Sequence, residues 1–223
     1  KTVNIFHMFI DTHSHIYAEE FEADRDQVVE RALSADVKYI ILPDIDRTTR
    51  SSMLTLAEQY PRIMLPLLGV HPTSVNASYK EEYAAFEKLL GKYTIYGIGE
   101  CGMDLYWDKT YYKEQIEVFE RQLNIAREMN LPVIIHSRES LSEIFTVLKR
   151  QHYNMKGILH CFPGNTEDAK RAVDLGFLLG IGGVVTYKKS LMAEVVKEIG
   201  TDHLVLETDA PYLTPVPYRG KRN

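Results

Sequence analysis

Short apolar runs alternate with longer helical segments along the whole sequence, and this alternation restricts the fold more than any other feature. The runs are rich in β-branched residues, and helix-type periodicity fills the intervals between them. The sequence predicts eight strands, at Met8–Thr12, Tyr39–Leu42, Leu65–Val70, Tyr96–Glu100, Val133–His136, Gly157–His160, Leu178–Gly182 and Leu204–Glu207. It predicts seven helices, at Ala23–Ala35, Ser51–Tyr60, Tyr79–Leu90, Lys113–Met129, Leu141–Arg150, Thr166–Leu175 and Leu191–Ile199.

Strands that are apolar on both faces and alternate with helices are typical of parallel β/α units. Eight such units predict the α/β fold of a TIM (β/α)8 barrel, and an open doubly wound sheet is the alternative. We expect one domain over residues 1–223, because no linker, repeat or low-complexity stretch interrupts the pattern. Only Asp209–Asn223 follow the last expected strand, so the eighth helix of a complete barrel is expected to be missing from this chain.

Polar residues gather where the expected strands end, which is the edge that forms the active site of such a barrel. The first of these ends carries Asp11, His13 and His15, whose two-residue spacing puts them on one face of an extended strand. Five of the eight histidines lie at strand ends. The further candidates at these ends are His71, Glu100, His136, His160, Glu207 and Asp209. Imidazole and carboxylate groups together are the ligands of divalent metals.

This donor set predicts a hydrolytic two-metal site. The first ion is expected to be held by His13, His15, Glu100 and Asp209, and the second by Glu100, His136 and His160, with Glu100 as the bridge. Asp209 is the expected catalytic residue, which orients or deprotonates the attacking water. Mg²⁺ is the ion expected in cells, although imidazole-rich ligation also suits Zn²⁺ or Mn²⁺. Asp11 is expected to support the ligands, and Glu207 to support them or to hold a further ion.

Substrate contacts are expected from loops beside these ligands, at Arg138, Asp104, Tyr106 and His71. Arg138 shares a face with His136 and suits an anionic oxygen, and Tyr106 and Trp107 offer rings for stacking on a base. A local basic rim is expected from Lys188, Lys189, Arg219, Lys221 and Arg222. Cys101 and Cys161 directly follow expected ligands, so strand alternation turns them toward the core rather than the metals.

The composition excludes few functions. A net charge of −5 argues against a protein that coats polyanions, but a local positive charge or bound metals would still admit nucleic acid. No apolar run approaches the roughly 20 residues of a membrane span, and no export signal is visible, so we expect a cytoplasmic monomer without membrane contact. His7, His152 and His203 lie away from strand ends and are expected at the surface or in packing.

Six segments in order make the sequence resemble the TatD family of metal-dependent hydrolases and deoxyribonucleases, within the amidohydrolase-like barrels. They are Phe9–His15, Gly69–Pro72, Gly97–Asp104, Ile135–Arg138, Leu159–Gly164 and Leu206–Leu213. The resemblance implies a TIM barrel, divalent metals and hydrolysis of phosphodiester bonds, and it agrees with the ligand set above. Glu100 separates the chain from amidohydrolases that use a carboxylated lysine as the bridge.

Two segments depart from the family. Glu139 follows His136-Ser-Arg138, where relatives often have Asp, and this leaves substrate preference open. The closing Arg219-Gly-Lys-Arg-Asn223 matches, but the family normally continues beyond it into a final helix.

Three functions are consistent with this sequence. The first is a DNA exonuclease, because an acidic protein with a metal-filled pocket suits attack on a strand end, with DNA single strands or ends as the nucleic-acid substrate. The alternative is a metal-dependent hydrolase of a carboxylic ester or amide, such as an aminoacyl ester on RNA, since the same metal chemistry serves carbon and phosphorus centres. The third is a non-catalytic partner protein, against which the complete set of six expected ligands argues.

Overall fold

The computed structural model describes residues 8–151 and 155–223, so His7 and His152 lie outside the described residues. Within these ranges the strands are β1 (Phe9–Asp11), β2 (Val37–Leu42), β3 (Met64–Pro66), β4 (Ile98–Asp104), β5 (Val133–Arg138), β6 (Gly157–Leu159), β7 (Phe177–Ile181) and β8 (Leu204–Leu206). The α-helices are α1 (Arg25–Ser34), α2 (Arg50–Gln59), α3 (Tyr79–Glu87), α4 (Tyr112–Glu128), α5 (Leu141–Arg150), α6 (Thr166–Asp174) and α7 (Met192–Ile199). The predicted order of strands and helices is confirmed. None of these helices is long and apolar enough to cross a membrane.

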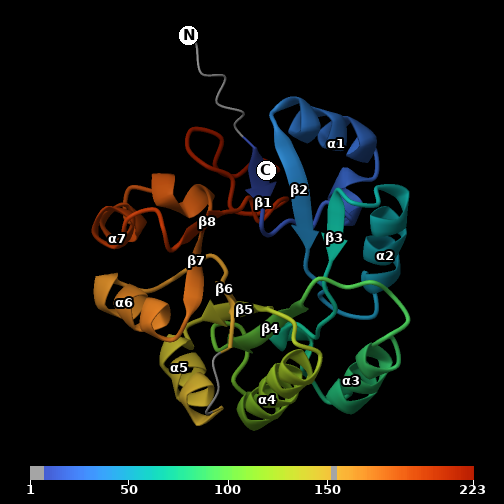
Figure 1. The fold of residues 1–223 in the computed structure, drawn as a ribbon, viewed down its shortest axis with the longest axis vertical. Coiled ribbons are helices and arrows are strands. Elements are labelled where there is room, and N and C mark those ends of the chain that lie inside the picture. Colours follow the sequence, from blue (N-terminus) through green and yellow to red (C-terminus); the bar gives the residue numbers. More distant parts are fainter. Residues whose placement is uncertain (1–7, 152–154) are drawn as a thin grey trace.

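The strands pair in parallel, and the helices follow one another around them in chain order (Figure 1). One sheet has the order β1-β2-β3 and the other β4-β5-β6-β7-β8. Backbone bridges join the two sheets on both sides, between Leu68 and Ile98 and between Ser14 and Ala210. The sheets therefore close into the predicted barrel rather than an open doubly wound layer. No α-helix follows β8 within the described residues 207–223, as expected.

The boundaries of β4 differ from the prediction Tyr96–Glu100. The strand begins at Ile98 and continues to Asp104, so Glu100 lies inside it rather than at its end. Gly102 explains the extension, because a Cβ at this position would lie 2.1 Å from the backbone oxygen of His136 on β5. A larger residue would force the strands apart, whereas glycine lets the pairing with β5 continue.

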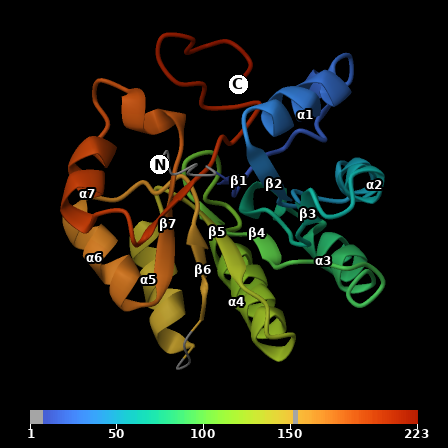
Figure 2. The ribbon, with the colours of Figure 1, turned by 45° about the horizontal axis from the view of Figure 1, so that its top comes forward.

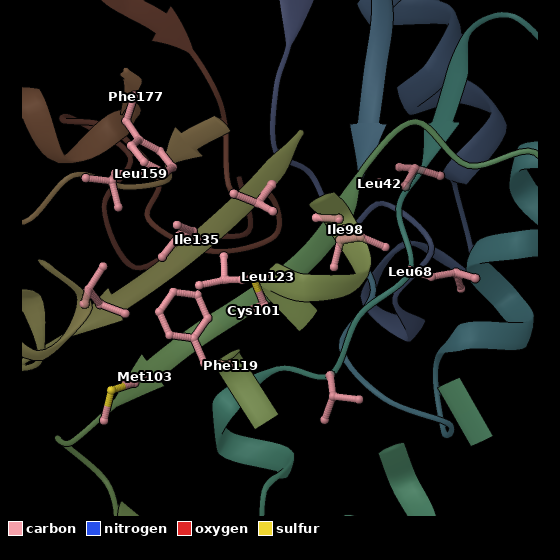
Figure 3. Packing of buried hydrophobic residues seen from close by; sticks show 14 of the residues in the cluster. Leu42, Leu68, Ile98, Cys101, Met103, Phe119, Leu123, Ile135, Leu159 and Phe177 are labelled. Atoms are coloured by element: carbon pink, nitrogen blue, oxygen red, sulfur yellow. The ribbon is translucent and has the colours of Figure 1, made fainter. Parts of the chain in front are cut away.

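The space between strands and helices is filled by one cluster of buried apolar side chains. Figure 3 shows Phe119 and Leu123 of α4 packed against Cys101 of β4. Cys101 is fully buried, which confirms its expected place in the core, and burial raises the pKa of its thiol above the ordinary range. Cys161 is only partly buried. The packed cluster holds the strands that carry the polar residues described below.

A buried ionic network lies beside the end of β2. The Arg50 Nε donates to Asp44 Oδ2 at 2.5 Å, and its Nη2 donates to Glu82 Oε1 at 2.9 Å. The backbone of Asp44 in turn pairs with β4, since its carbonyl accepts from the Glu100 backbone N–H at 3.0 Å. The network therefore ties α2 and α3 to the strand that carries Glu100.

Replacing Arg50 with Met is expected to lower the free energy of unfolding by about 3–5 kcal/mol, because Asp44 and Glu82 would stay buried without their cation. Urea unfolding monitored by circular dichroism measures the loss. The matched control is Lys170→Met, which removes an exposed ion pair with Glu198 (2.7 Å) and should change stability by at most about 1 kcal/mol. Equal losses in the two variants would contradict the structural role of Arg50.

Candidate metal centre

The carboxyl ends of the strands bring the predicted polar residues to one side of the barrel. His13 and His15 follow β1 and His160 follows β6, while Asp209 follows β8. Glu100 lies in the middle part of β4, and His136 lies in the second half of β5. The six residues predicted as metal ligands therefore come from five different strands or strand ends and share one edge, although they are spread over almost the whole sequence.

Glu100 occupies the middle of this cluster, with each carboxylate oxygen facing a different group. Its Oε2 lies 3.1 Å from His13 Nε2 and 3.7 Å from His15 Nε2. Its Oε1 lies 2.9 Å from His136 Nδ1 and 3.2 Å from His160 Nε2. A carboxylate placed in this way can give one oxygen to each of two cations, which is the geometry that a bridging role requires.

Asp209 completes the group on the side of β1. Its Oδ1 lies 3.7 Å from His13 Nε2 and 3.6 Å from His15 Nε2. The backbone N–H of Asp209 donates to the carbonyl of His13 at 2.9 Å, which sets the carboxylate beside the two rings. Ligand atoms of His13, His15 and Asp209 all lie within 4.8 Å of one another, close enough for one ion.

His71 lies deeper in the cluster than its predicted role as a substrate contact implied. Its Nε2 is 3.4 Å from Glu100 Oε1, while its Nδ1 contacts the Thr73 hydroxyl at 2.6 Å. His71, Glu100 and His136 form a second group whose ligand atoms lie within 4.8 Å of one another. The backbone N–H of His71 donates to the carbonyl of Ile45. His71 is thus placed to ligate or orient a second cation as well as to line the pocket.

The protonation states of the central carboxylate and of the two imidazoles after β1 suit a cation. Burial opposes the ionisation of Glu100, but the surrounding imidazoles outweigh it and hold its pKa well below the usual value. Burial lowers the pKa of His13 to about 4 and that of His15 well below its usual value, so both rings are neutral at pH 7. Burial also opposes protonation of His160, but Glu100 and Glu207 hold its pKa well above the usual value. Glu100, His13 and His15 thus have lone pairs free for a cation, whereas His160 must release its proton before it can ligate one.

Unpaired atoms give a direct test of whether a metal ion fits. The Nε2 atoms of His13 and His15 face each other at 3.1 Å, and the rings of His13 and His160 stack with centroids 3.6 Å apart. His160 Nδ1 and Glu207 Oε2 are buried without a hydrogen-bond partner. Nitrogen lone pairs that face one another in this way lack hydrogen-bond donors within the protein. A divalent cation between them would accept their lone pairs, so the residues fit such an ion.

Two further carboxylates, Asp11 and Glu207, lie beside the ligand candidates, and ligand atoms of Glu207, His13 and His160 also lie within 4.8 Å of one another. Asp11 accepts hydrogen bonds from the Thr208 backbone N–H (2.9 Å) and hydroxyl (2.7 Å), and so joins the end of β1 to the loop after β8. Glu207 accepts from the Cys161 backbone N–H at 2.6 Å and lies 3.4 Å from His160 Nδ1. The hydrogen bonds of these two carboxylates hold in place the segments that carry Asp209 and His160.

The observed position of Asp104 differs from its predicted role as a substrate contact. It was expected to contact substrate, but its side chain is buried, and its Oδ2 lies 3.0 Å from His136 Nε2. The reason is the extension of β4, which carries Asp104 to a position opposite Arg138 on β5 and beside His136. Asp104 therefore orients the His136 ring and leaves its Nδ1 toward Glu100.

Tyr17 is a site residue that the sequence reasoning missed. Its hydroxyl lies 2.7 Å from His15 Nδ1 and donates to the carbonyl of Pro43 at 2.5 Å. The hydroxyl thus holds the His15 ring with its Nε2 toward the cluster. The signal was present in the sequence, because Tyr17 continues the two-residue spacing of His13 and His15.

The remaining predicted contacts lie at or after the carboxyl ends of β4, β5 and β8. Arg138 and Tyr106 are exposed beside His136, at the ends of β5 and β4. Of the predicted basic rim, Arg219 lies over the Tyr187 ring at 4.4 Å, whereas Arg222 turns away to pair with Asp24 at 2.6 Å. Figure 2 shows the closing segment passing between α7 and α1, which is why Arg222 reaches Asp24.

A closed α/β barrel with imidazoles and carboxylates buried at the carboxyl ends of its strands has the architecture of a metal-dependent hydrolase. The fold and the donor set of this chain place it in that class. Residues 10–223 match the family model described as TatD related DNase. The chain therefore belongs to the TatD family.

Individual relatives agree with this assignment. The chain is 40% identical over 218 residues to the uncharacterized metal-dependent hydrolase YabD of Bacillus subtilis, covering 97% of this chain and 85% of that protein. It is 32% identical over 199 residues to the 3'-5' ssDNA/RNA exonuclease TatD of Erwinia amylovora, covering 88% of this chain and 77% of that protein. Among solved structures, the TatD homologue YjjV of Escherichia coli K12 aligns with a TM-score of 0.85 and 32% identity, covering 96% of this chain and 84% of that one.

Proposed function

We propose that this protein hydrolyses phosphodiester bonds of single-stranded DNA or RNA from a strand end, with the help of two divalent metal ions. The observation that carries the proposal is the position of Glu100, whose two oxygens face separate sets of imidazoles. Two cations held on one carboxylate would flank a single reacting phosphate, which is the arrangement used in phosphodiester hydrolysis. The name of the Erwinia amylovora relative, a 3'-5' ssDNA/RNA exonuclease, supports the same substrate class.

Each residue of the cluster has a distinct part in this proposal. His13, His15 and Asp209 would hold one ion, His136 and His160 would hold the other, and Glu100 would give one oxygen to each. The ions supply positive charge that acidifies a water molecule and stabilises negative charge on the attacked phosphorus. Asp209 orients that water and accepts its proton. Its side chain is more exposed than that of Glu100, so it can contact a water molecule at the edge of the cluster.

Chelation tests the metal requirement. Hydrolysis of a single-stranded oligonucleotide should fall at least about 100-fold when EDTA removes the ions, because the water then loses its activating charge. Added Mn²⁺ or Mg²⁺ should restore the rate. Product lengths on a gel, from strands blocked at the 3' or the 5' end, measure both the rate and the end attacked. Full activity in EDTA would contradict the proposal.

An assay on a second substrate distinguishes hydrolysis at a phosphorus centre from hydrolysis at a carbonyl carbon. The same preparation is assayed on an aminoacyl ester of RNA, at equal metal concentration. We expect the oligonucleotide to be turned over faster. Faster hydrolysis of the ester, with the oligonucleotide left intact, would replace the phosphodiesterase assignment by that of an esterase.

A further inference from the structure

The short loop that follows β4 exposes two aromatic rings beside the candidate metal centre. The Trp107 side chain is 69% exposed and that of Tyr106 is 50% exposed. Single exposed apolar side chains are common, but adjoining ones beside a polar cluster form a patch typical of binding sites. Trp107 is also the single tryptophan of the chain.

Arg138 joins these rings into one surface. Its guanidinium lies over the Tyr106 ring at 3.8 Å from the centroid and 5.1 Å from that of Trp107. The rings of Tyr106 and Trp107 meet edge to face, with centroids 4.9 Å apart and planes at 85°. Three planar groups thus hold one another in place. Stacking on the rings orders the guanidinium, which therefore offers its donors to an anion with little further loss of conformational freedom.

Asp104 fixes this surface relative to the metal centre. Its Oδ1 accepts from the backbone N–H groups of Tyr106 at 3.0 Å and Trp107 at 3.4 Å, while its Oδ2 contacts His136 at 3.0 Å. Gln115 of α4 holds the Asp104 backbone from behind, with hydrogen bonds of 2.9 and 3.1 Å to its N–H and carbonyl. One carboxylate therefore positions a candidate ligand and the aromatic loop together.

We propose that Trp107, Tyr106 and Arg138 form a stacking subsite for an unpaired nucleobase next to the reacting phosphate. An open aromatic face binds any base through its π surface, and the guanidinium contacts the adjoining phosphate. A base in a duplex has both faces covered by its neighbours, so the subsite selects single strands without selecting sequence. The inference rests on the proposed function, because it places the base of a strand whose phosphate lies at the metals.

Tryptophan fluorescence tests the subsite directly, since all tryptophan emission comes from Trp107. The metal-loaded protein is titrated with a short phosphorothioate oligothymidylate and with an abasic strand of the same length and charge. We expect saturable quenching by the thymine strand and little by the abasic strand. Equal quenching by both strands would overturn the stacking proposal.

Variants give the corresponding affinities, measured by the anisotropy of a labelled strand. Trp107→Ala should weaken binding of the thymine strand about tenfold, within the range for base–aromatic stacking, whereas Trp107→Phe should keep most of the affinity. Tyr96→Ala is the matched control, because Tyr96 is a 45% exposed ring that precedes β4 and so lies toward the opposite end of the barrel. Wild-type affinity in Trp107→Ala would overturn the proposal.

Failure of the stacking subsite and failure of the proposed function give different experimental results. Quenching and anisotropy measure binding alone and do not depend on hydrolysis. If the wild-type protein stacks the thymine strand but never hydrolyses a phosphodiester, the proposed function fails and the subsite stands. If it hydrolyses single strands but Trp107→Ala has an unchanged KM and affinity, the subsite fails and the proposed function stands.

Discussion

Glu100→Gln is expected to lower the hydrolytic rate at least about 10³-fold and to reduce the metal bound per protein. Changes to groups that merely support ligands already cost about 10–100-fold, and Glu100 is the proposed bridge between both ions. Glutamine has nearly the same shape as glutamate but no charge, and one carboxylate oxygen becomes an NH₂ donor. That donor would point at imidazole nitrogens, which now lie 2.9–3.7 Å from the carboxylate.

The measurement pairs kcat on a single-stranded oligonucleotide with elemental analysis of the dialysed protein. Glu194→Gln, on the exposed side of α7, is the matched control and should leave rate and metal content unchanged. Thermal unfolding of both variants checks that the barrel is intact. A Glu100→Gln protein that binds two ions and turns over at the wild-type rate would show that another group bridges them.

Asp209→Asn is expected to lower kcat by about 10²–10⁴-fold, the range of a general base, with a smaller change in KM. The substitution keeps the shape of the side chain but removes the group that takes the proton from water. Single-turnover rates on the same oligonucleotide, at saturating metal, separate this effect from weaker metal binding. An unchanged single-turnover rate would assign the proton transfer to a different residue.

Metal affinity is expected to depend on pH because Asp209 must be deprotonated to hold a cation. Burial raises the pKa of Asp209 to about 7 in the metal-free protein, with Glu100 and Glu207 nearby contributing in the same direction. A raised pKa means that the carboxyl is protonated below pH 7 and must lose that proton before it can hold a cation. Metal affinity should therefore fall between pH 8 and pH 6, and less steeply in Asp209→Asn. Isothermal titration calorimetry in two buffers of different ionisation enthalpy measures the protons released.

The barrel and the central donor set could be predicted because both depend on spacing along the chain. Alternating apolar runs and helical segments predict parallel β/α units whatever their side-chain contacts. The strand ends of such units meet at one edge, so His13, Glu100 and Asp209 come together from distant parts of the sequence. Their meeting at one edge follows from the parallel arrangement of the strands and does not depend on individual side-chain contacts.

Contacts between neighbouring strands could not be predicted in the same way. Asp104 was placed in a loop because the strand seemed to end at Glu100, whereas Gly102 lets β4 pair further with β5. The place of Asp104 beside His136 depends on the register in which β4 pairs with β5. The sequence of either strand by itself does not specify this register. His71 was likewise assigned to substrate, because its approach to Glu100 depends on how the loop after β3 folds back over β4.

The hydrogen bonds that join the carboxyl end of β1 to the loop after β8 have a consequence for the order of folding. Asp11 and Thr208 are bonded although they lie 197 positions apart in sequence, and Asp209 bonds to His13 at the same seam. During synthesis, His13 and His15 emerge well before β8 and must await that strand before Asp209 reaches them. Such long-range contacts form late and cost chain entropy. A cation that binds only the joined ends would favour the closed barrel by mass action, so metal supply would govern how firmly the first and last strands stay together.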